Sequence, residues 1–427
     1  MSIPSSPVLS REAVALLEEM LPFYDRLARQ TGNSEKLSFE TAEANRRVGA
    51  IRQRLGQMDE AVQAYQRSIE LYERLRSGSL TNPAITLGTA QVDNELGRIY
   101  NSRRQVAEAR EAHKAALALL ESDGAESAYS AEWRFELART CYFLGTQERP
   151  LPGTDPRKGQ EPAQLPTQER DFLAKSVALL KSLPTLPSSN PEIQHLLALC
   201  YLEGAPVEDG RGAAVKAGAD HAIEILQHLV NAFPGISDYA YDLSEAYARI
   251  HIPQPPIPPE EQEQIEDRLA KSMALLERLT TQHPDIPDFP AAEARACEKS
   301  GAFHRQIGDW EKAEQEFRQA IALQAPLLKS FPGVPSYGLW MATLRIALAD
   351  AMLHRNEPEE ARKILGETIS TLMGQLQTRP DIPPPHGLLA LGYSKLAVAL
   401  RQIGEKNQAD EAERKAKHEQ SLVSPSR

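Results

Sequence analysis

The sequence has 427 residues, of which 41% are hydrophobic and 25% charged, as is usual for a soluble folded protein. Its net charge of −11 argues against sequence-independent binding to nucleic acid, because neutralising phosphates needs a basic surface. The longest apolar run, residues 196–202, is too short to cross a membrane, and no basic segment followed by an apolar one opens the chain, so we expect a cytoplasmic protein.

The first segment predicts a tail and one helix without a partner. Residues 1–9 are rich in Pro and Ser, and Ser10 can cap a helix whose apolar residues keep helical spacing to about Gln30. Pro22 lies within this helix and should bend it or move its start. We assign residues 1–31 to the tail and this leading helix.

From residue 32 onward the sequence repeats. A short turn with a proline at each end returns at 284–287, 332–335 and 380–383, in steps of 48 residues, and a related turn starts 50 residues earlier at Pro234. A fixed period of this length is typical of a helical-repeat array. The frame predicts eight units that start near 32, 80, 128, 188, 234, 284, 332 and 380. We therefore predict one solenoid over 32–420, followed by a disordered tail at 421–427.

Each unit is predicted to hold two helices that cross closely. The residue seventeen positions after each start is small in seven of eight units, and close crossing requires small residues because larger side chains hold the backbones apart. These residues are Gly49, Gly97, Gly145, Ala205, His251, Gly301, Ala349 and Ala397. We expect helices of about 18 to 20 residues, or roughly 27 to 30 Å at 1.5 Å per residue.

In the first two units, the second helices carry core stripes at helical spacing. The stripes are Ala61, Tyr65, Ile69 and Tyr72 in unit one, and Ala109, His113, Ala116 and Leu120 in unit two. We interpret the tyrosines as packing residues rather than as a stacking platform.

Units three to five are interrupted by runs rich in proline or glycine, at 149–167, 204–218 and 253–259. Each run lies between the two helices predicted for its unit, and its composition favours a loop. The glycine run lacks the Gly-Lys-Ser/Thr motif of a phosphate-binding loop. Because such loops fall on the same edge of a solenoid, we expect the three runs to form one border.

Units six to eight carry the clearest helix signals. Asp309 and Glu357 stand before the apolar stripes of the second helices in units six and seven, and Pro358 suits a first helical position. Pro326 should kink the second helix of unit six. The last predicted helix, 405–420, is highly charged, as expected where a terminal repeat faces water.

No catalytic, cofactor-binding or metal-binding pattern is present in the sequence, so we predict a non-enzymatic protein without a cofactor. The histidines never form HExxH or a similar ligand spacing, and there is no GxSxG, phosphate-loop or kinase motif. Cys141, Cys200 and Cys297 fall at nearly the same position of their units, on the inner side of the first helix. We expect them to be small, reduced core residues.

Units one, two, six, seven and eight resemble the tetratricopeptide repeat. Gly49, Gly56, Ala61 and Tyr65 of unit one recur in unit six, as Gly301, Gly308, Ala313 and Phe317. The resemblance implies an all-α, right-handed α-solenoid of stacked antiparallel helix pairs. The period is longer than the family's usual length of about 34 residues. It is similar to that of arrays fused to bacterial Ser/Thr kinases.

Two functions are implied by the resemblance. The first is a protein-interaction scaffold that binds a peptide or a partner protein in a concave groove. The second is a regulatory or sensor component of a bacterial Ser/Thr kinase or related signalling system.

In the family, the exposed faces of the first helices line the groove. By the frame, this implies contacts from Glu43, Arg46, Arg54, Asn94, Arg98, Asn101, Arg139, Tyr142 and Arg149. Arginine and asparagine dominate this set, which favours a partner with an acidic or carboxylate-bearing segment. The alternative, that these arginines are solvated or paired with neighbouring glutamates, stays open.

Overall fold

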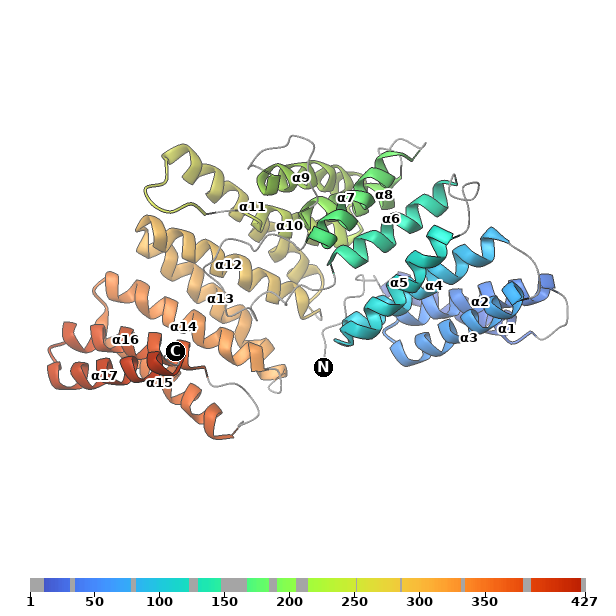
Figure 1. The fold of residues 1–427 in the computed structure, drawn as a ribbon. Helices are drawn as coiled ribbons and strands as arrows, with labels where there is room; N and C mark the ends of the chain where they lie inside the picture. Colours follow the sequence, from blue (N-terminus) through green and yellow to red (C-terminus); the bar gives the residue numbers. More distant parts are fainter. Residues whose placement is uncertain are drawn as a thin grey trace. The chain divides into compact units, whose positions relative to one another are not determined.

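The computed structural model describes residues 11–30, 35–77, 82–122, 130–146, 167–183, 190–204, 214–250, 252–284, 286–331, 335–378 and 385–423. These residues form seventeen α-helices and contain no strand, so the predicted all-α class is confirmed (Figure 1). No described helix combines the length and the apolar character needed to span a membrane.

The helices are α1 (Arg11–Ala28), α2 (Glu35–Arg54), α3 (Met58–Ser77), α4 (Pro83–Ser102), α5 (Val106–Ser122), α6 (Ala131–Thr146), α7 (Thr167–Lys181), α8 (Pro191–Leu202), α9 (Ala214–Ala232), α10 (Ser237–Ala248), α11 (Pro259–Gln282), α12 (Asp288–Ile307), α13 (Trp310–Ser330), α14 (Pro335–His354), α15 (Pro358–Thr378), α16 (His386–Gln402) and α17 (Lys406–Val423).

The chain divides into two compact units, each of which contains several of the predicted repeats. Numerals (unit 1, unit 2) denote these compact units, and number words (unit one to unit eight) denote the repeats. Unit 1 comprises Met1–Pro150 and Pro156–Ala246, and unit 2 contains the chain from Tyr247 to Arg427. From α1 to α9 in unit 1 and from α11 to α17 in unit 2, each helix packs on the next helix along the chain, as α16 and α17 show in Figure 1. First helices of successive pairs also touch, α2 on α4 and α4 on α6 in unit 1, and α12 on α14 and α14 on α16 in unit 2. This is the stacking of helix pairs that the repeat predicts.

Side-chain caps explain where several helices begin. The Asn82 side chain accepts a hydrogen bond from the Ala84 backbone N–H (3.0 Å), and Pro83 occupies the first turn of α4. Asp309 caps α13 in the same way, by accepting from the Lys312 N–H at 3.1 Å. Each cap satisfies a backbone donor that the first turn of a helix leaves unpaired. The predicted start at Asp309 is confirmed.

Several turns between the two helices of a pair share one backbone conformation. A residue with positive φ follows the first helix, and the next residue donates its N–H to the carbonyl five residues back, as from Asp309 to His304 at 2.9 Å. This bond is the signature of a Schellman helix end. The positive-φ residues with this bond are Gly56, Arg104, Gly308, Asn356 and Gly404.

Close helix crossing is confirmed at the predicted glycines. A Cβ atom on Gly49 would lie 2.6 Å from the Tyr65 ring, and one on Gly301 would lie 2.9 Å from the Phe317 ring. The Ser68 hydroxyl donates across the same interface to the Ala42 carbonyl at 2.8 Å. Small residues therefore let α3 and α13 each place a large buried ring against the backbone of the preceding helix.

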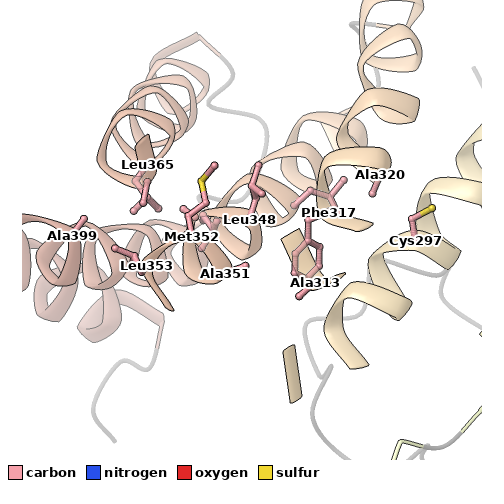
Figure 2. Packing of buried hydrophobic residues seen from close by; sticks show 14 of the residues in the cluster. Cys297, Ala313, Phe317, Ala320, Leu348, Ala351, Met352, Leu353, Leu365 and Ala399 are labelled. Atoms are coloured by element: carbon pink, nitrogen blue, oxygen red, sulfur yellow. The ribbon is translucent and has the colours of Figure 1, made fainter. Parts of the chain in front are cut away.

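The core of unit 2 runs from α12 to α16 and alternates alanines with larger apolar side chains (Figure 2). Phe317 and Met352 are almost wholly buried in it, beside small residues such as Ala313 and Cys297. All three cysteines are buried and free, and burial raises the pKa of the Cys141 and Cys200 thiols to about 12. They are core residues, as predicted.

The expected helix length of about 18 to 20 residues is wrong for several helices. α8 and α10 have 12 residues each, and α11 has 24. α8 ends just before Gly204, which has φ of 86°, and α10 ends shortly before the proline run at 253–259. That run is confirmed as non-helical up to Pro258.

Pro22 does not move the start of its helix, since α1 begins at Arg11 and continues through it, and α13 continues through Pro326. A bend at either proline stays a prediction. The last helix, α17, continues to Val423, so the predicted tail at 421–427 begins in helix. The division of 32–420 into eight units stays a prediction, because residues 332–334 and 379–384 of its joints lie outside the described residues. The predicted loops at 149–167 and 204–218 are too long at their ends, because Thr167 begins α7 and residues 214–218 belong to α9. Residues 149–166 and 205–213 lie outside the described residues, so the predicted border of loops also stays a prediction.

Candidate peptide-binding surface

The first part of the predicted surface is an ion pair on α2. Arg46 Nη2 lies 2.8 Å from Glu43 Oε2, and the hydroxyl of Tyr72 from α3 donates to the other oxygen of Glu43. Burial by itself would raise the pKa of Glu43, but Arg46 and Tyr72 hold it below its ordinary value. Glu43 is therefore a carboxylate with both oxygens in use, and the Arg46 side chain stays 28% exposed.

Glu95 is the central carboxylate of the surface. Its Oε2 lies 2.9 Å from Arg98 on α4, and its Oε1 accepts a hydrogen bond from Arg139 on α6. Burial alone would raise the pKa of Glu95, but the two guanidinium groups hold it at about 2. Arg139 also approaches Glu136 on its own helix, with 3.6 Å between Nε and Oε1. Glu95 and Arg139 thus join α4 to α6 by a charged contact.

Asn94 lies in the core, so the prediction that it lines an exposed face is wrong. It is fully buried, and its amide N–H₂ group donates to Glu136 Oε1 at 2.6 Å and to Thr140 Oγ1 at 2.8 Å. Its oxygen lies 3.0 Å from Nδ1 of His113, which therefore carries the proton. Because α4 packs against both α2 and α6, this side of the helix meets a neighbour instead of solvent.

The remaining predicted residues are placed differently from one another. Arg54 and Asn101 are exposed near the C-terminal ends of α2 and α4. Tyr142 is half-buried, with its ring 5.7 Å from that of Phe143. Arg149 lies outside the described residues.

We call Glu43, Arg46, Glu95, Arg98 and Arg139 the unit 1 ion-pair ladder. It runs along α2, α4 and α6, with the guanidinium groups partly exposed and the carboxylates paired beneath them. The open alternative, that these arginines pair with neighbouring glutamates, is what the structure shows. Such a surface can still accept a ligand, because one guanidinium has five N–H donors and one carboxylate engages at most two of them.

The frame assigned four of the five ladder residues to this surface and missed only Glu95. Glu95 stands three residues before Arg98, a spacing that places both on one side of a helix and could have indicated the pair. Its contact with Arg139, 44 residues away, depends on how α4 and α6 pack and has no local sequence signal.

Unit 2 has a comparable charged contact between first helices. Asp350 on α14 accepts a hydrogen bond from Lys395 Nζ on α16 at 2.6 Å and lies 3.8 Å from Arg305 on α12. Its carboxylate is largely buried among the three helices. Within the described part of the chain, no group of His, Cys, Asp and Glu is arranged to hold a metal ion.

Comparison with known families gives one match. Residues 42–74 match the model of the tetratricopeptide repeat, and this range spans α2 from Ala42 onward and most of α3. The α2–α3 pair is therefore a tetratricopeptide repeat, as the residues of unit one predicted. No curated protein matches the sequence.

Several solved structures are similar over most of their length. The apo form of RapI has a TM-score of 0.47 at 10% identity, with 96% of this chain and 93% of that chain covered. Aspartyl phosphate phosphatase F from Bacillus subtilis has 0.36 at 13% identity, with 98% and 97% covered. NprR in complex with its cognate peptide NprX has 0.36 at 11% identity, with 92% and 98% covered. All three TM-scores are below 0.5.

Proposed function

We propose that this chain is a non-enzymatic scaffold that binds a peptide or a partner protein through the first-helix face of unit 1. The observation that carries the proposal is the ion-pair ladder, which presents partly exposed arginines on three successive first helices. The match of α2 and α3 to the tetratricopeptide repeat supports it, because stacked helix pairs of this kind expose one face of each first helix.

The ladder favours a partner segment that carries carboxylates. Arg46 and Arg98 are each bound to a glutamate, yet 28% and 37% of their side chains remain exposed, so free N–H groups point to solvent. A glutamate on the same helix also fixes each guanidinium in place, which lowers the entropy lost when a ligand binds. Arg54 is exposed and makes no ion pair with any described residue, so it adds a free cation near the same face.

The proposal is tested by a binding assay after the partner has been captured and identified by mass spectrometry. We expect Arg46→Ala combined with Arg98→Ala to weaken binding by roughly 1.5 to 3 kcal/mol for each charged hydrogen bond lost, measured by calorimetry. Arg67→Ala is the matched control, because Arg67 is exposed on the second helix α3 of the same pair. Circular dichroism should show all three proteins folded.

Three outcomes would change the proposal. Unchanged affinity of the folded double variant would remove the ladder as the binding surface. Equal loss in Arg67→Ala would indicate a general effect of charge instead of a site. Capture of a protein kinase as a stoichiometric partner would favour a regulatory role in signalling, the second function considered from the sequence.

A further inference from the structure

Helix α1 exposes a row of large apolar side chains. Leu16 is 57% exposed, Met20 38% and Phe23 52%. Their spacing of four and three residues places them on one face of the helix, and Leu27, four residues further, continues the row. Exposed apolar residues scattered singly are ordinary, but three in register along one helix form a contact surface.

This row faces away from the rest of unit 1. Other sides of α1 are held to α2 by two polar contacts, one from Arg47 to the Tyr24 hydroxyl at 2.8 Å and one from Arg52 to Asp25 at 3.2 Å. The Phe23 ring lies edge-on to the Tyr24 ring, with centroids 5.3 Å apart, at the border of the row. Leu17 and Leu21 are partly buried on the side that packs on α2. The two faces of α1 are thus both apolar, and only one of them is used within unit 1.

Two opposite charges flank the exposed row on the same side. Glu19 and Arg26 are exposed and stand seven residues apart, which is two helical turns. When two such helices pack antiparallel, Met20 lies opposite Phe23 of the second copy, and Leu16 opposite Leu27. Glu19 then lies beside Arg26 of the second copy, and Arg26 beside Glu19, because flanking positions of this type pair with each other in antiparallel helices.

A parallel arrangement gives no such match. Equivalent residues would then lie level, and each flank of one helix would lie beside the opposite flank of the second copy. On α1 that flank carries Leu17 and Tyr24, so Glu19 and Arg26 would meet no opposite charge there. The face is therefore complementary to itself only in the antiparallel direction. Such a surface is what a two-fold symmetric interface requires, since the same patch must serve both copies.

We propose that the exposed face of α1 is a self-association surface, on which two copies of this chain pack their α1 helices antiparallel. The apolar row supplies the contact, and two Glu19–Arg26 pairs set its direction. This surface is distinct from the ion-pair ladder on α2, α4 and α6, so the proposal does not depend on the proposed function.

The first test is the mass of the full chain in solution, measured by sedimentation over a range of concentrations. We expect wild type to approach twice the mass of one chain as concentration rises, and Phe23→Glu and Met20→Glu to remain single chains. Both side chains are exposed, so circular dichroism and the melting temperature should stay unchanged in the variants. Arg67→Glu, on α3, serves as a matched control and should associate as wild type does.

The second test uses the charges alone. Glu19→Arg places two Arg–Arg contacts in the dimer, and Arg26→Glu places two Glu–Glu contacts, so each variant should associate at least several-fold more weakly than wild type. In an equimolar mixture of the two variants, every flanking contact pairs Arg with Glu again. We therefore expect the mixture to form mixed dimers with the strength of wild type.

The outcomes are decisive in both directions. A wild type that stays a single chain at every concentration overturns the proposal, as does a dimer that forms equally well with Phe23→Glu. Mixing that fails to restore association overturns the antiparallel arrangement, and a parallel pair is then the remaining geometry. Association that persists when Arg46 and Arg98 are both replaced by alanine shows that the two surfaces are separate.

Discussion

The imidazole of His113 and the side-chain amide of Asn94 form a buried pair, with Nδ1 and Oδ1 3.0 Å apart, which joins α5 to α4. Both groups are almost wholly inaccessible to water, and the Phe143 ring stacks on the imidazole with centroids 4.9 Å apart. Burial, helped by the nearby Arg139, lowers the pKa of His113 to about 3. The histidine is therefore a neutral donor, and a proton on its second nitrogen would place a charge in the core.

This pair predicts a pH dependence of folding. An unfolded chain protonates His113 as the pH falls below about 6.5, whereas the folded chain does so only near its lowered pKa. The stability that neutral His113 contributes is thus complete above the pKa of the unfolded chain. It is lost as the pH falls from that pKa to the lower pKa of the folded chain. We expect a loss of about 5 kcal/mol at most. Urea unfolding at a series of pH values should show the slope in wild type and a flatter slope in His113→Gln. His418→Gln, at an exposed position of α17, should leave the slope unchanged.

Asp93 is predicted to act in the opposite direction. Burial, with the nearby Glu73, raises its pKa to about 7. The folded chain therefore holds a proton that the unfolded chain has lost, so stability falls as the pH rises from the ordinary value of an aspartate to about 7. We expect Asp93→Asn to be more stable than wild type at pH 8, by up to about 4 kcal/mol, and nearly equal to it at pH 4. Asp410→Asn, whose side chain is 69% exposed, should show no such divergence, and if it did, net charge would be the cause.

Gly301 is predicted to tolerate no added methyl group. A Cβ atom there would lie 2.9 Å from the Phe317 ring, so Gly301→Ala must displace a buried aromatic side chain. Overpacking of this kind costs about 1 to 3 kcal/mol. The matched substitution Gly366→Ala, inside α15, meets no atom within 4 Å and should stabilise the chain by up to about 1 kcal/mol through helix propensity. If Gly301→Ala and Gly366→Ala had equal effects on thermal or urea unfolding, Gly301 would not be required for close helix crossing.

Arg104 is predicted to be a strained turn residue. It has φ of 60° in the turn after α4, where Gly308 and Gly404 stand in the corresponding turns of other pairs. This conformation costs a non-glycine residue roughly 1 to 2 kcal/mol of folding free energy. Glycine avoids that cost, but part of the benefit is offset because glycine has more conformational freedom in the unfolded chain. Arg104→Gly should therefore stabilise the chain by up to about 1 kcal/mol, while Gly308→Ala should destabilise it. A destabilised Arg104→Gly, measured by urea unfolding, would mean that the arginine side chain makes a contact that outweighs its backbone strain.

The sequence predicted those parts of the fold that depend on residue size and spacing. A close helix crossing needs a small residue, which predicted the positions of Gly49 and Gly301. A large ring at helical spacing needs a core, which predicted the burial of Tyr65 and Tyr72. Helix length in the middle of the chain was not predictable in this way. The twelve-residue α8 and α10 end at loops whose composition predicts a break but not its first residue.

The candidate surface was harder to predict than the fold. Counting from the start of each unit assigned Asn94 and Arg98 to the same face, yet the first is buried against α6 and the second is partly exposed. Asn94 and Arg98 are four positions apart, so their side chains point only about 40° apart around the helix axis. A small error in the orientation of α4 therefore changes which neighbour each side chain meets. The contact between Glu95 and Arg139 depends on that packing and on no local pattern.

The stacking of helices within each unit also bears on how the chain folds. Each substantial contact within a unit joins a helix to one of the next two along the chain, so no described contact of this kind requires the ends of a unit to meet. Contacts between near neighbours cost little loop-closure entropy, and proteins rich in them fold fast for their size. A ribosome releases the N-terminal helices first, and these already have their packing partners. Each pair can therefore acquire its structure during synthesis, before the following pairs have been made.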